Sequence, residues 1–243
     1  MAQTLKRLLT IDRFSNMKYL KVLLFGIFAG LAIGLGSFVF TIVCTYLPGE
    51  GGKMFASCLF SIGLILVCVL GLQLYTGKIG VFLDDREKIG ENALNLPIML
   101  VGNAIGAFAL GILCHFIFMN VQDVADKILA ISLGKTGSTT VFIQGILCGA
   151  LVYIAVYCYK NFQNWAMKII GIIVAVTLFV YCGFQHCIAN MFYFGMAFNW
   201  NIDMLWNLLI VILTNSIGAL LVRCLVHLAA LIATKKDNNE EKE

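Results

Sequence analysis

The chain has three histidines, and His186 lies in an apolar run, residues 169–202, that contains no Asp, Glu, Lys or Arg. The surrounding segment, residues 183–191, reads Gly-Phe-Gln-His-Cys-Ile-Ala-Asn-Met, so Gln185 and Asn190 accompany the imidazole. An imidazole can donate, accept or transfer a proton near neutral pH. Ionisable groups within apolar membrane segments usually face a bundle interior or a pathway. His186 could therefore hydrogen-bond to a small weak-acid anion, or exchange a proton with it.

A second stretch, residues 71–77, has the same Gly-x-Gln opening and lies 112 residues earlier. At this spacing Gln73 corresponds to Gln185, whereas His186 corresponds to Leu74. Thr76 adds a hydroxyl group, although a threonine in a helix can also bond to its own backbone. The alternative for a buried histidine is a purely structural hydrogen bond. We favour a functional site at His186 because the repeated pattern does not account for it.

Composition places these stretches in a membrane. The chain of 243 residues is 60% hydrophobic and 12% charged, with a mean hydropathy of +0.92, whereas soluble domains carry about 25% charged residues. No basic face with interleaved aromatic residues is present, so nucleic acid is not an expected partner. The expected partners are the lipid bilayer and small monovalent anions.

Six apolar runs are long enough to span a bilayer, which takes about 20 residues. They begin with residues 22–49 and continue as 54–77, 92–122, 136–159, 169–202 and 204–234, the last interrupted by Arg223. The fifth run would be about 50 Å long as one straight helix, so we expect it to be tilted, broken or partly re-entrant. Residues 1–21 form a basic amphipathic segment typical of a membrane surface. Residues 235–243 form a charged tail that we expect to be disordered.

An internal repeat relates the two halves of the domain, residues 22–234. Residues 95–107 match residues 207–219 at the same offset of 112, and the first span resembles the fourth at an offset of 119. Each repeat, about residues 22–119 and 136–234, holds three spans, so the two must have opposite topologies. Inverted repeats build channels and transporters whose sites lie where broken helices meet. The breaks are predicted at residues 72–77 and 184–190.

Loop charges predict the orientation of the chain. With the N-terminus inside, the cytoplasmic segments carry thirteen Lys and Arg residues and the outer loops carry three, namely Lys53, Lys127 and Lys135. The positive-inside rule then places both termini in the cytoplasm of a multi-pass plasma-membrane protein.

Two other functions remain open from the residues alone. A channel for small neutral solutes would use the same broken-helix architecture. A membrane redox or metal enzyme would use the pairs Cys114–His115 and His186–Cys187, but neighbouring side chains on a helix point in different directions. None of the nine cysteines forms a CxxC pair, and buried thiols often act as small hydrophobic groups. We therefore expect no metal, no cofactor and no enzymatic activity.

The two polar stretches resemble those of the formate/nitrite transporter family of formate, nitrite and hydrosulfide channels. Residues 183–191 are similar to the family signature GFEHSIANM, and residues 74–77 to its LFTG or LFTS break. The resemblance implies an all-α fold, a homopentamer of aquaporin-like six-helix protomers with broken second and fifth helices, each with its own pore. It also implies transport of small monovalent weak-acid anions, with proton coupling through a central pore histidine, His186, and its companion Thr76.

The resemblance further implies two hydrophobic constrictions and two vestibules. The outer constriction would consist of Phe60, Leu64 and Phe179, and the inner one of Leu74, Tyr75 and Val152. Vestibule lysines would attract anions, with Lys135 on the outer side and Lys18 or Lys21 on the inner side. The chain departs from the family pattern at Gln185, where a glutamate is usual, and at Gly149, where an asparagine is usual.

Overall fold

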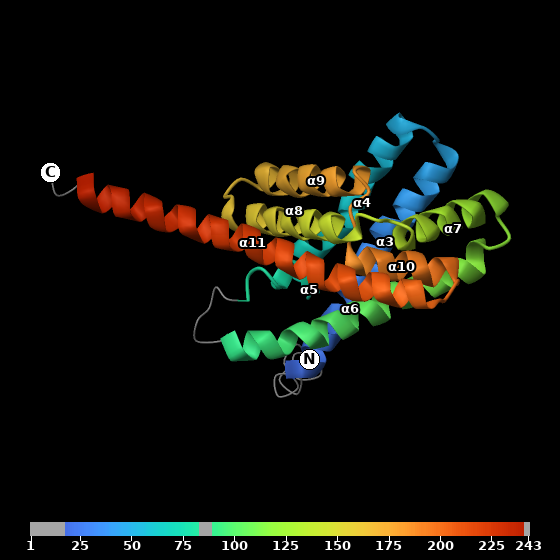
Figure 1. Cartoon of the computed structure of the whole chain (residues 1–243), viewed down its shortest axis with the longest axis horizontal. Helices are drawn as coiled ribbons and strands as arrows, with labels where there is room; N and C mark the ends of the chain where they lie inside the picture. The colour runs from blue at the N-terminus through green and yellow to red at the C-terminus, as the bar shows by residue number, and fades with distance from the viewer. Residues whose placement is uncertain (1–17, 83–88, 241–243) are drawn as a thin grey trace, which may run out of the picture.

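A computed structural model describes residues 18–82 and 89–240, and their regular structure is helical. Figure 1 shows the helices packed side by side, with the end of α11 projecting beyond the bundle. The elements are α3 Lys18–Tyr46, α4 Glu50–Val69, α5 Tyr75–Lys78, α6 Ile89–Phe118, α7 Gln122–Thr136, α8 Val141–Asn161, α9 Trp165–Tyr181, α10 Cys187–Ala197 and α11 Ile202–Glu240. Most of the amphipathic segment predicted over residues 1–21 lies outside the described residues.

Several helices are membrane spans by length and composition. Among the described residues, five are long and apolar enough, namely α3, α4, α6, α8 and the Ile202–Ala233 part of α11. The fifth run predicted from sequence is broken, as one of the expected alternatives, into two shorter helices, α9 and α10, of 17 and 11 residues. Large apolar side chains such as Phe116 and Val174 are exposed on the outside of the bundle. Such an outer surface suits lipid, and the chain is a multi-pass membrane protein.

Two helical segments differ from the sequence-based expectation. The connection between the third and fourth spans was predicted to be a loop, but it forms α7. This helix buries Val124, Ile128 and Ser132, four residues apart along one face, a spacing that places side chains together on a helix. In addition, α11 continues to Glu240, so most of the tail predicted to be disordered is helical. The tail contains Lys and Glu, which are good helix formers and lengthen a helix that is already nucleated.

Both helix breaks begin with the same backbone motif. After α4, Gly71 takes a left-handed φ of 65°, and the Leu72 N–H donates to the carbonyl five residues earlier at 2.9 Å. After α9, Gly183 has φ 74°, and the Phe184 N–H makes the equivalent bond, also at 2.9 Å. This is the Schellman ending, which needs a residue that tolerates positive φ. The paired Gly-x-Gln openings are therefore helix terminators.

Asn103 of α6 holds the first break in place. Its Oδ1 accepts from the Tyr75 backbone N–H at 2.8 Å. Its Nδ2 donates to the carbonyls of Gly26 and Gln73, both at 2.8 Å. Because a bilayer core offers no water to unpaired backbone groups, one asparagine here satisfies three of them. This side chain ties α3, the break and α6 together.

Asn215 of α11 does the same for the second break. Its Oδ1 accepts from the Cys187 N–H at 3.0 Å. Its Nδ2 donates to the carbonyls of Gly145 at 2.9 Å and Gln185 at 2.8 Å. Asn215, Cys187 and Gln185 lie 112 positions after their counterparts in the first half, which are Asn103, Tyr75 and Gln73. Gly145 lies 119 positions after its counterpart, Gly26. The contacts repeat at the offsets found in the sequence.

Glycines let the asparagine-bearing helices approach their neighbours. A Cβ atom on Gly30 of α3 would overlap the carbonyl oxygen of Asn103, and one on Gly149 of α8 would overlap that of Asn215. Small residues at such crossings permit close packing of membrane helices. Position 149 therefore has no room for the asparagine that is usual in the family pattern, because its Cβ direction faces α11.

Candidate pore site between the two helix breaks

The two breaks bring His186 and Thr76 into contact. The imidazole Nε2 and the threonine Oγ1 lie 2.9 Å apart, and both side chains are buried, with exposed fractions of 3% and 1%. The residues are 110 positions apart in the chain but adjacent at the meeting point of α5 and α10. The sequence-based expectation that these two residues come together therefore agrees with the geometry.

The hydrogen bonds of His186 define its tautomer. The residue is the N-cap of α10, and its Nδ1 accepts from the Ala189 backbone N–H at 3.2 Å. An Nδ1 that accepts a hydrogen bond carries no proton, so the neutral ring carries its proton on Nε2. The Nε2–H then donates to the Thr76 hydroxyl oxygen. Its repeat counterpart, Leu74, caps α5 without a side-chain bond.

The Thr76 hydroxyl has a proton of its own to offer. Among the residues that the structure describes, its oxygen makes no hydrogen bond other than the one from His186. A hydroxyl group is a single donor as well as an acceptor. Because its acceptor side faces the imidazole, the O–H can donate to a group lying between the breaks. The pair thus presents a buried hydrogen-bond donor.

Aromatic rings surround the site on one side. The Phe179 ring stacks on the His186 ring with centroids 5.9 Å apart, and the Phe60 ring meets Phe179 edge-on at 6.0 Å. Leu64, one turn after Phe60 on α4, is buried. The rings of Phe60 and Phe179 form an apolar collar, and Leu64 is the third residue of the expected outer constriction.

The opposite side of the site is also apolar. Leu74 and Val152 are each 1% exposed, and Leu74 lines a cavity of about 120 Å³. Tyr75 is directed elsewhere, because its hydroxyl lies 2.8 Å from the Ser216 hydroxyl of α11. Of the expected inner constriction, Leu74 and Val152 present only apolar groups, whereas the polar end of Tyr75 is bonded to α11.

Cavities lie beyond both apolar layers, at the two ends of the bundle. We call the end that holds Lys78 and Lys160 the first mouth, and the end that holds Lys53 and Lys135 the second mouth. The cavity at the second mouth has a volume of about 250 Å³ and reaches His186. Its other lining residues include Phe60, Phe179, Gln144, Gly183, Asn190 and Tyr193. The cavity at the second mouth therefore extends past the aromatic collar as far as the buried imidazole.

Lys135, at the end of α7, provides positive charge in the second mouth. Its Nζ donates to the carbonyls of Gly183 and Phe184, each at 3.3 Å. Burial lowers the pKa of this ammonium group to about 8, since a low-dielectric environment disfavours the charged form. Among the described residues, no carboxylate pairs with it. The positive charge thus faces the cavity without a counter-ion from these residues.

Gln185 positions Lys135 through an amide cluster. Its Nε2 donates to the Lys135 carbonyl at 3.0 Å, and its Oε1 accepts from Asn190 at 2.7 Å and Asn207 at 3.1 Å. Asn207 donates to the same Lys135 carbonyl at 2.9 Å. A glutamate could not make the Gln185 donation when ionised. Sequence reasoning missed the role of Asn207, although the repeat had matched it to Asn95.

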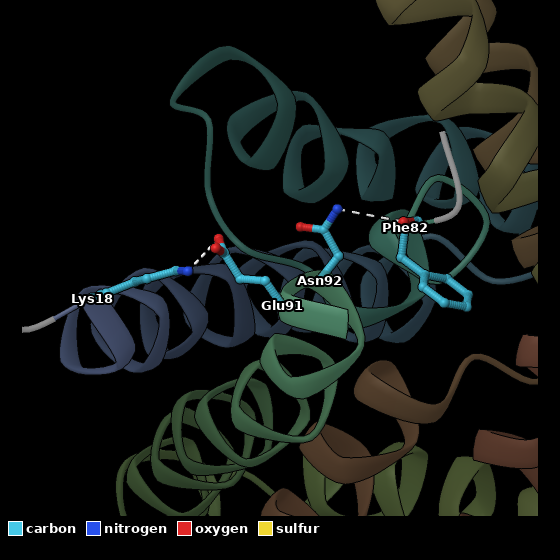
Figure 2. A network of polar contacts seen from close by, with 4 residues as sticks. All are labelled: Lys18, Phe82, Glu91 and Asn92. Atoms are coloured by element: carbon cyan, nitrogen blue, oxygen red, sulfur yellow. Dashed lines mark hydrogen bonds and ion pairs between the residues drawn. The ribbon is translucent and has the colours of Figure 1, made fainter. Parts of the chain in front are cut away.

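The expected inner vestibule lysines are engaged elsewhere. Lys18 forms an ion pair with Glu91 of α6, as Figure 2 shows. The Lys21 ammonium lies 5.8 Å from the centroid of a phenylalanine ring on its own helix. The cavities of the first mouth are lined instead by Lys78 and Lys160, which sequence reasoning had counted only as loop charges.

Comparisons with known proteins match this chain to transporters and channels for formate and nitrite. A family profile described as formate/nitrite transporter matches residues 10–229. The uncharacterized transporter YrhG of Bacillus subtilis is 31% identical over 250 residues, covering 94% of this chain and 92% of that protein. The formate channel FocA of Haemophilus influenzae is 29% identical over 186 residues, covering 71% and 64%. A solved structure described as a pentameric formate channel with formate bound has a TM-score of 0.68 and 25% identity, covering 90% and 96%.

Proposed function

The chain belongs to the formate/nitrite transporter family, and on this premise we propose that it is a homopentameric channel for small monovalent weak-acid anions such as formate and nitrite. Its relatives are channels and transporters, so the chain is a transport protein and not an enzyme. The observation that carries the substrate class is the buried pair of His186 and Thr76, which presents a hydrogen-bond donor, the Thr76 hydroxyl, between two apolar layers.

Each protomer, in this proposal, is an aquaporin-like bundle of six spans arranged as two inverted repeats. The first repeat comprises α3, the broken α4–α5 span and α6, and the second comprises α8, the broken α9–α10 span and α11. Support comes from the contacts of Asn103 and Asn215, which recur at the offsets of the sequence repeat. The pore runs between the breaks of one protomer. The charge bias of the loops favours an orientation in which the first mouth faces the cytoplasm. Both chain termini then also lie in the cytoplasm.

An anion entering from the second mouth is first attracted by Lys135. It must then shed water to pass the collar of Phe60 and Phe179, which is costly for a charge. A hydrogen bond from the Thr76 hydroxyl, whose oxygen accepts from the His186 Nε2–H, offsets part of that cost between the two breaks. The neutral Nε2–H tautomer supplies a hydrogen bond without itself being a proton source.

Proton-coupled passage through His186 requires a second step. The ring can take a second proton only if the Ala189 N–H leaves Nδ1, because two donors cannot face each other. The resulting imidazolium can transfer its Nε2 proton to the anion, which crosses as the neutral acid, and the ring is left neutral with its proton on Nδ1. Loss of the α10 cap is thus the structural event that would accompany coupling.

Replacing Thr76 by valine is expected to lower formate flux by about fivefold, since one lost hydrogen bond costs about 1 kcal/mol. Valine has nearly the shape of threonine but cannot pair with the His186 Nε2–H. Thr76→Ser retains the hydroxyl and should keep most of the flux. The comparison uses initial formate uptake into proteoliposomes with equal amounts of each protein. Equal rates for the valine and serine variants would contradict this role.

Formate uptake from the second mouth should fall as the pH rises through about 8, where the Lys135 ammonium loses its proton. Formate remains an anion over this range, so the change reports on the protein. Loss of the charge should reduce uptake by about tenfold, the lower end of electrostatic steering effects. Lys135→Arg keeps its charge and should show a flat profile. Identical profiles for the two proteins would exclude this attraction.

The proposed function is tested by the solutes that the purified protein passes. Proteoliposome uptake would be compared for formate, nitrite, hydrosulfide, acetate and lactate at two pH values, with glycerol and water swelling as neutral-solute controls. We expect the smallest anions to pass faster than acetate and lactate. Swelling with glycerol in the absence of anion uptake would instead support the neutral-solute channel.

A further inference from the structure

We propose that Asn190 is a specificity-determining residue of the pore, whose carboxamide oxygen accepts a hydrogen bond from the acidic proton of an undissociated weak acid. The inference rests on the proposed function, in that this acid is the protonated form of the anion that the channel transports. It assigns a role to a polar atom that neither the pair of His186 and Thr76 nor the amide cluster uses.

Asn190 lies in the wall of the second-mouth cavity, close to the imidazole. It is one turn after His186 on α10, and its backbone N–H donates to the His186 carbonyl at 2.9 Å. Residues four apart lie on the same face of a helix, and both residues line the cavity of about 250 Å³. The exposed fraction of Asn190 is 0%. Its carboxamide therefore belongs to the inner end of this cavity, where the solute meets the site between the breaks.

The amide cluster fixes the direction of the Asn190 carboxamide. Its Nδ2 donates to the Gln185 Oε1 at 2.7 Å and to the Asn207 Oδ1 at 2.8 Å. Because both partners are oxygen atoms, a carboxamide turned the other way would place acceptor against acceptor. Gln185 and Asn207 lie behind the wall, since neither lines the cavity that Asn190 lines. The nitrogen edge of Asn190 thus faces the cluster, and the oxygen edge is directed toward the cavity.

The Asn190 oxygen has no donor among the residues that the structure describes. The atom is buried and accepts no hydrogen bond from any of them. The titratable groups that line the cavity or pack against α10 each have another contact, namely His186 with Thr76, Tyr193 with Ser37, His115 with the Met196 carbonyl, Lys135 with the carbonyls of Gly183 and Phe184, and Lys53 with the ring of Tyr181. A buried acceptor that is left unpaired is unfavourable. The group that pairs with it is therefore a donor on the solute.

An acceptor at this position distinguishes the two forms of a weak acid. Formate and nitrite ions have only acceptor atoms, so either ion would leave the Asn190 oxygen unpaired and would be repelled by its partial negative charge. The undissociated acid has an O–H group that can donate to this oxygen. Its proton arrives with the acid from solution, so the protein neither gives nor takes a proton in this step. The ion is thus attracted near Lys135, whereas the neutral acid is selected at Asn190.

Infrared difference spectra with isotope-labelled formate measure which form the purified protein binds, without any transport. At about pH 5, where most free formate is ionised, the undissociated share of bound formate should exceed its share in solution by about tenfold. Asn190→Leu has a similar size but no acceptor and should lose this excess. Asn207→Leu is the matched control, because it breaks the same cluster but keeps the Asn190 oxygen, and it should retain the excess. Equal shares in bound and free formate for the wild-type protein would overturn the inference and identify water as the partner of this oxygen.

The ratio of formate flux to nitrate flux gives a second readout at the same pH. Nitrate is a small planar anion that stays ionised and has no proton to donate. After subtraction of the flux into protein-free vesicles, Asn190→Leu should lower this ratio by about tenfold. The ratio for Asn207→Leu should stay within about twofold of the wild type, even if both of its fluxes are lower. An equal fall in both variants would make Asn190 only a structural member of the cluster.

Failure of this inference and failure of the proposed function give different results. A wild-type protein that binds the undissociated acid in excess but passes none of the tested anions would refute the proposed function and leave the role of Asn190 standing. Anion flux without bound acid in the infrared spectrum would refute the role of Asn190 and leave the function standing.

Discussion

Replacing His186 by phenylalanine is expected to lower formate flux by about tenfold to a hundredfold, because a hydrogen bond to a charged group is worth about 1.5–3 kcal/mol. Phenylalanine fills a similar volume and stacks as well on Phe179, so the apolar collar remains. What is lost is the Nε2–H donor and its bond to Thr76. Without that bond the Thr76 hydroxyl is no longer oriented, so the anion would cross two apolar layers without a fixed hydrogen-bond donor. Stopped-flow uptake of formate into proteoliposomes measures the effect.

His115→Phe is the matched control for that substitution. His115 is also an imidazole bonded inside the protein, with its Nδ1 3.0 Å from the Met196 carbonyl, but it lies outside the site between the breaks. This variant should transport formate at close to the wild-type rate per folded pentamer. A His186→Phe protein that matched it in rate and in pH profile would remove His186 from the pathway.

Asn215→Ala should destabilise the protein more than any other single side-chain truncation discussed above. The substitution leaves the Cys187 N–H and the carbonyls of Gly145 and Gln185 without their partner. Each buried unsatisfied group costs about 1–3 kcal/mol, so the total loss is expected to be at least about 3 kcal/mol. Asn103→Ala should have a comparable effect, because it breaks the same three kinds of bond in the first half. The measurement is thermal unfolding of the purified pentamer in detergent.

Asn161→Ala controls for the loss of an asparagine as such. Its Nδ2 donates to the Tyr157 carbonyl at 2.9 Å, but on the exposed surface, where water can replace it. Its melting temperature should lie within a few degrees of the wild type, consistent with a surface change of about 0.5 kcal/mol. If the Asn215→Ala and Asn161→Ala proteins had the same melting temperature, Asn215 would not be the residue that holds the second break in place.

The sequence indicated the centre of the site because that centre depends on local signals. Gly71 and Gly183 are needed for the left-handed turns that end helices, and the repeat offset pointed to Asn103 and Asn215 as equivalent residues. The family signature then identified His186 with its companion threonine. These features follow from residue type and spacing, which a sequence contains in full.

The residues that sequence reasoning missed depend on tertiary packing. Lys78 was counted as a loop charge, but it is the last residue of the short helix α5 and lines a cavity. Asn207 bonds to Lys135 only because α7 is a helix that delivers its C-terminal end to the second break. Lys18 was assigned to a vestibule, whereas its ion pair with Glu91 depends on how α3 crosses α6. Neither the crossing nor α7 can be read from apolar periodicity alone.

Charge movement across the membrane tests anion passage through the wild-type protein most directly. Proteoliposomes adsorbed on a solid-supported membrane would receive a rapid formate jump at constant pH. We expect a transient current that carries negative charge into the vesicles. The current of the His186→Phe protein should be at most about one tenth as large. No current from the wild-type protein, together with glycerol-driven swelling of the same vesicles, would contradict an anion channel and identify a pore for neutral solutes.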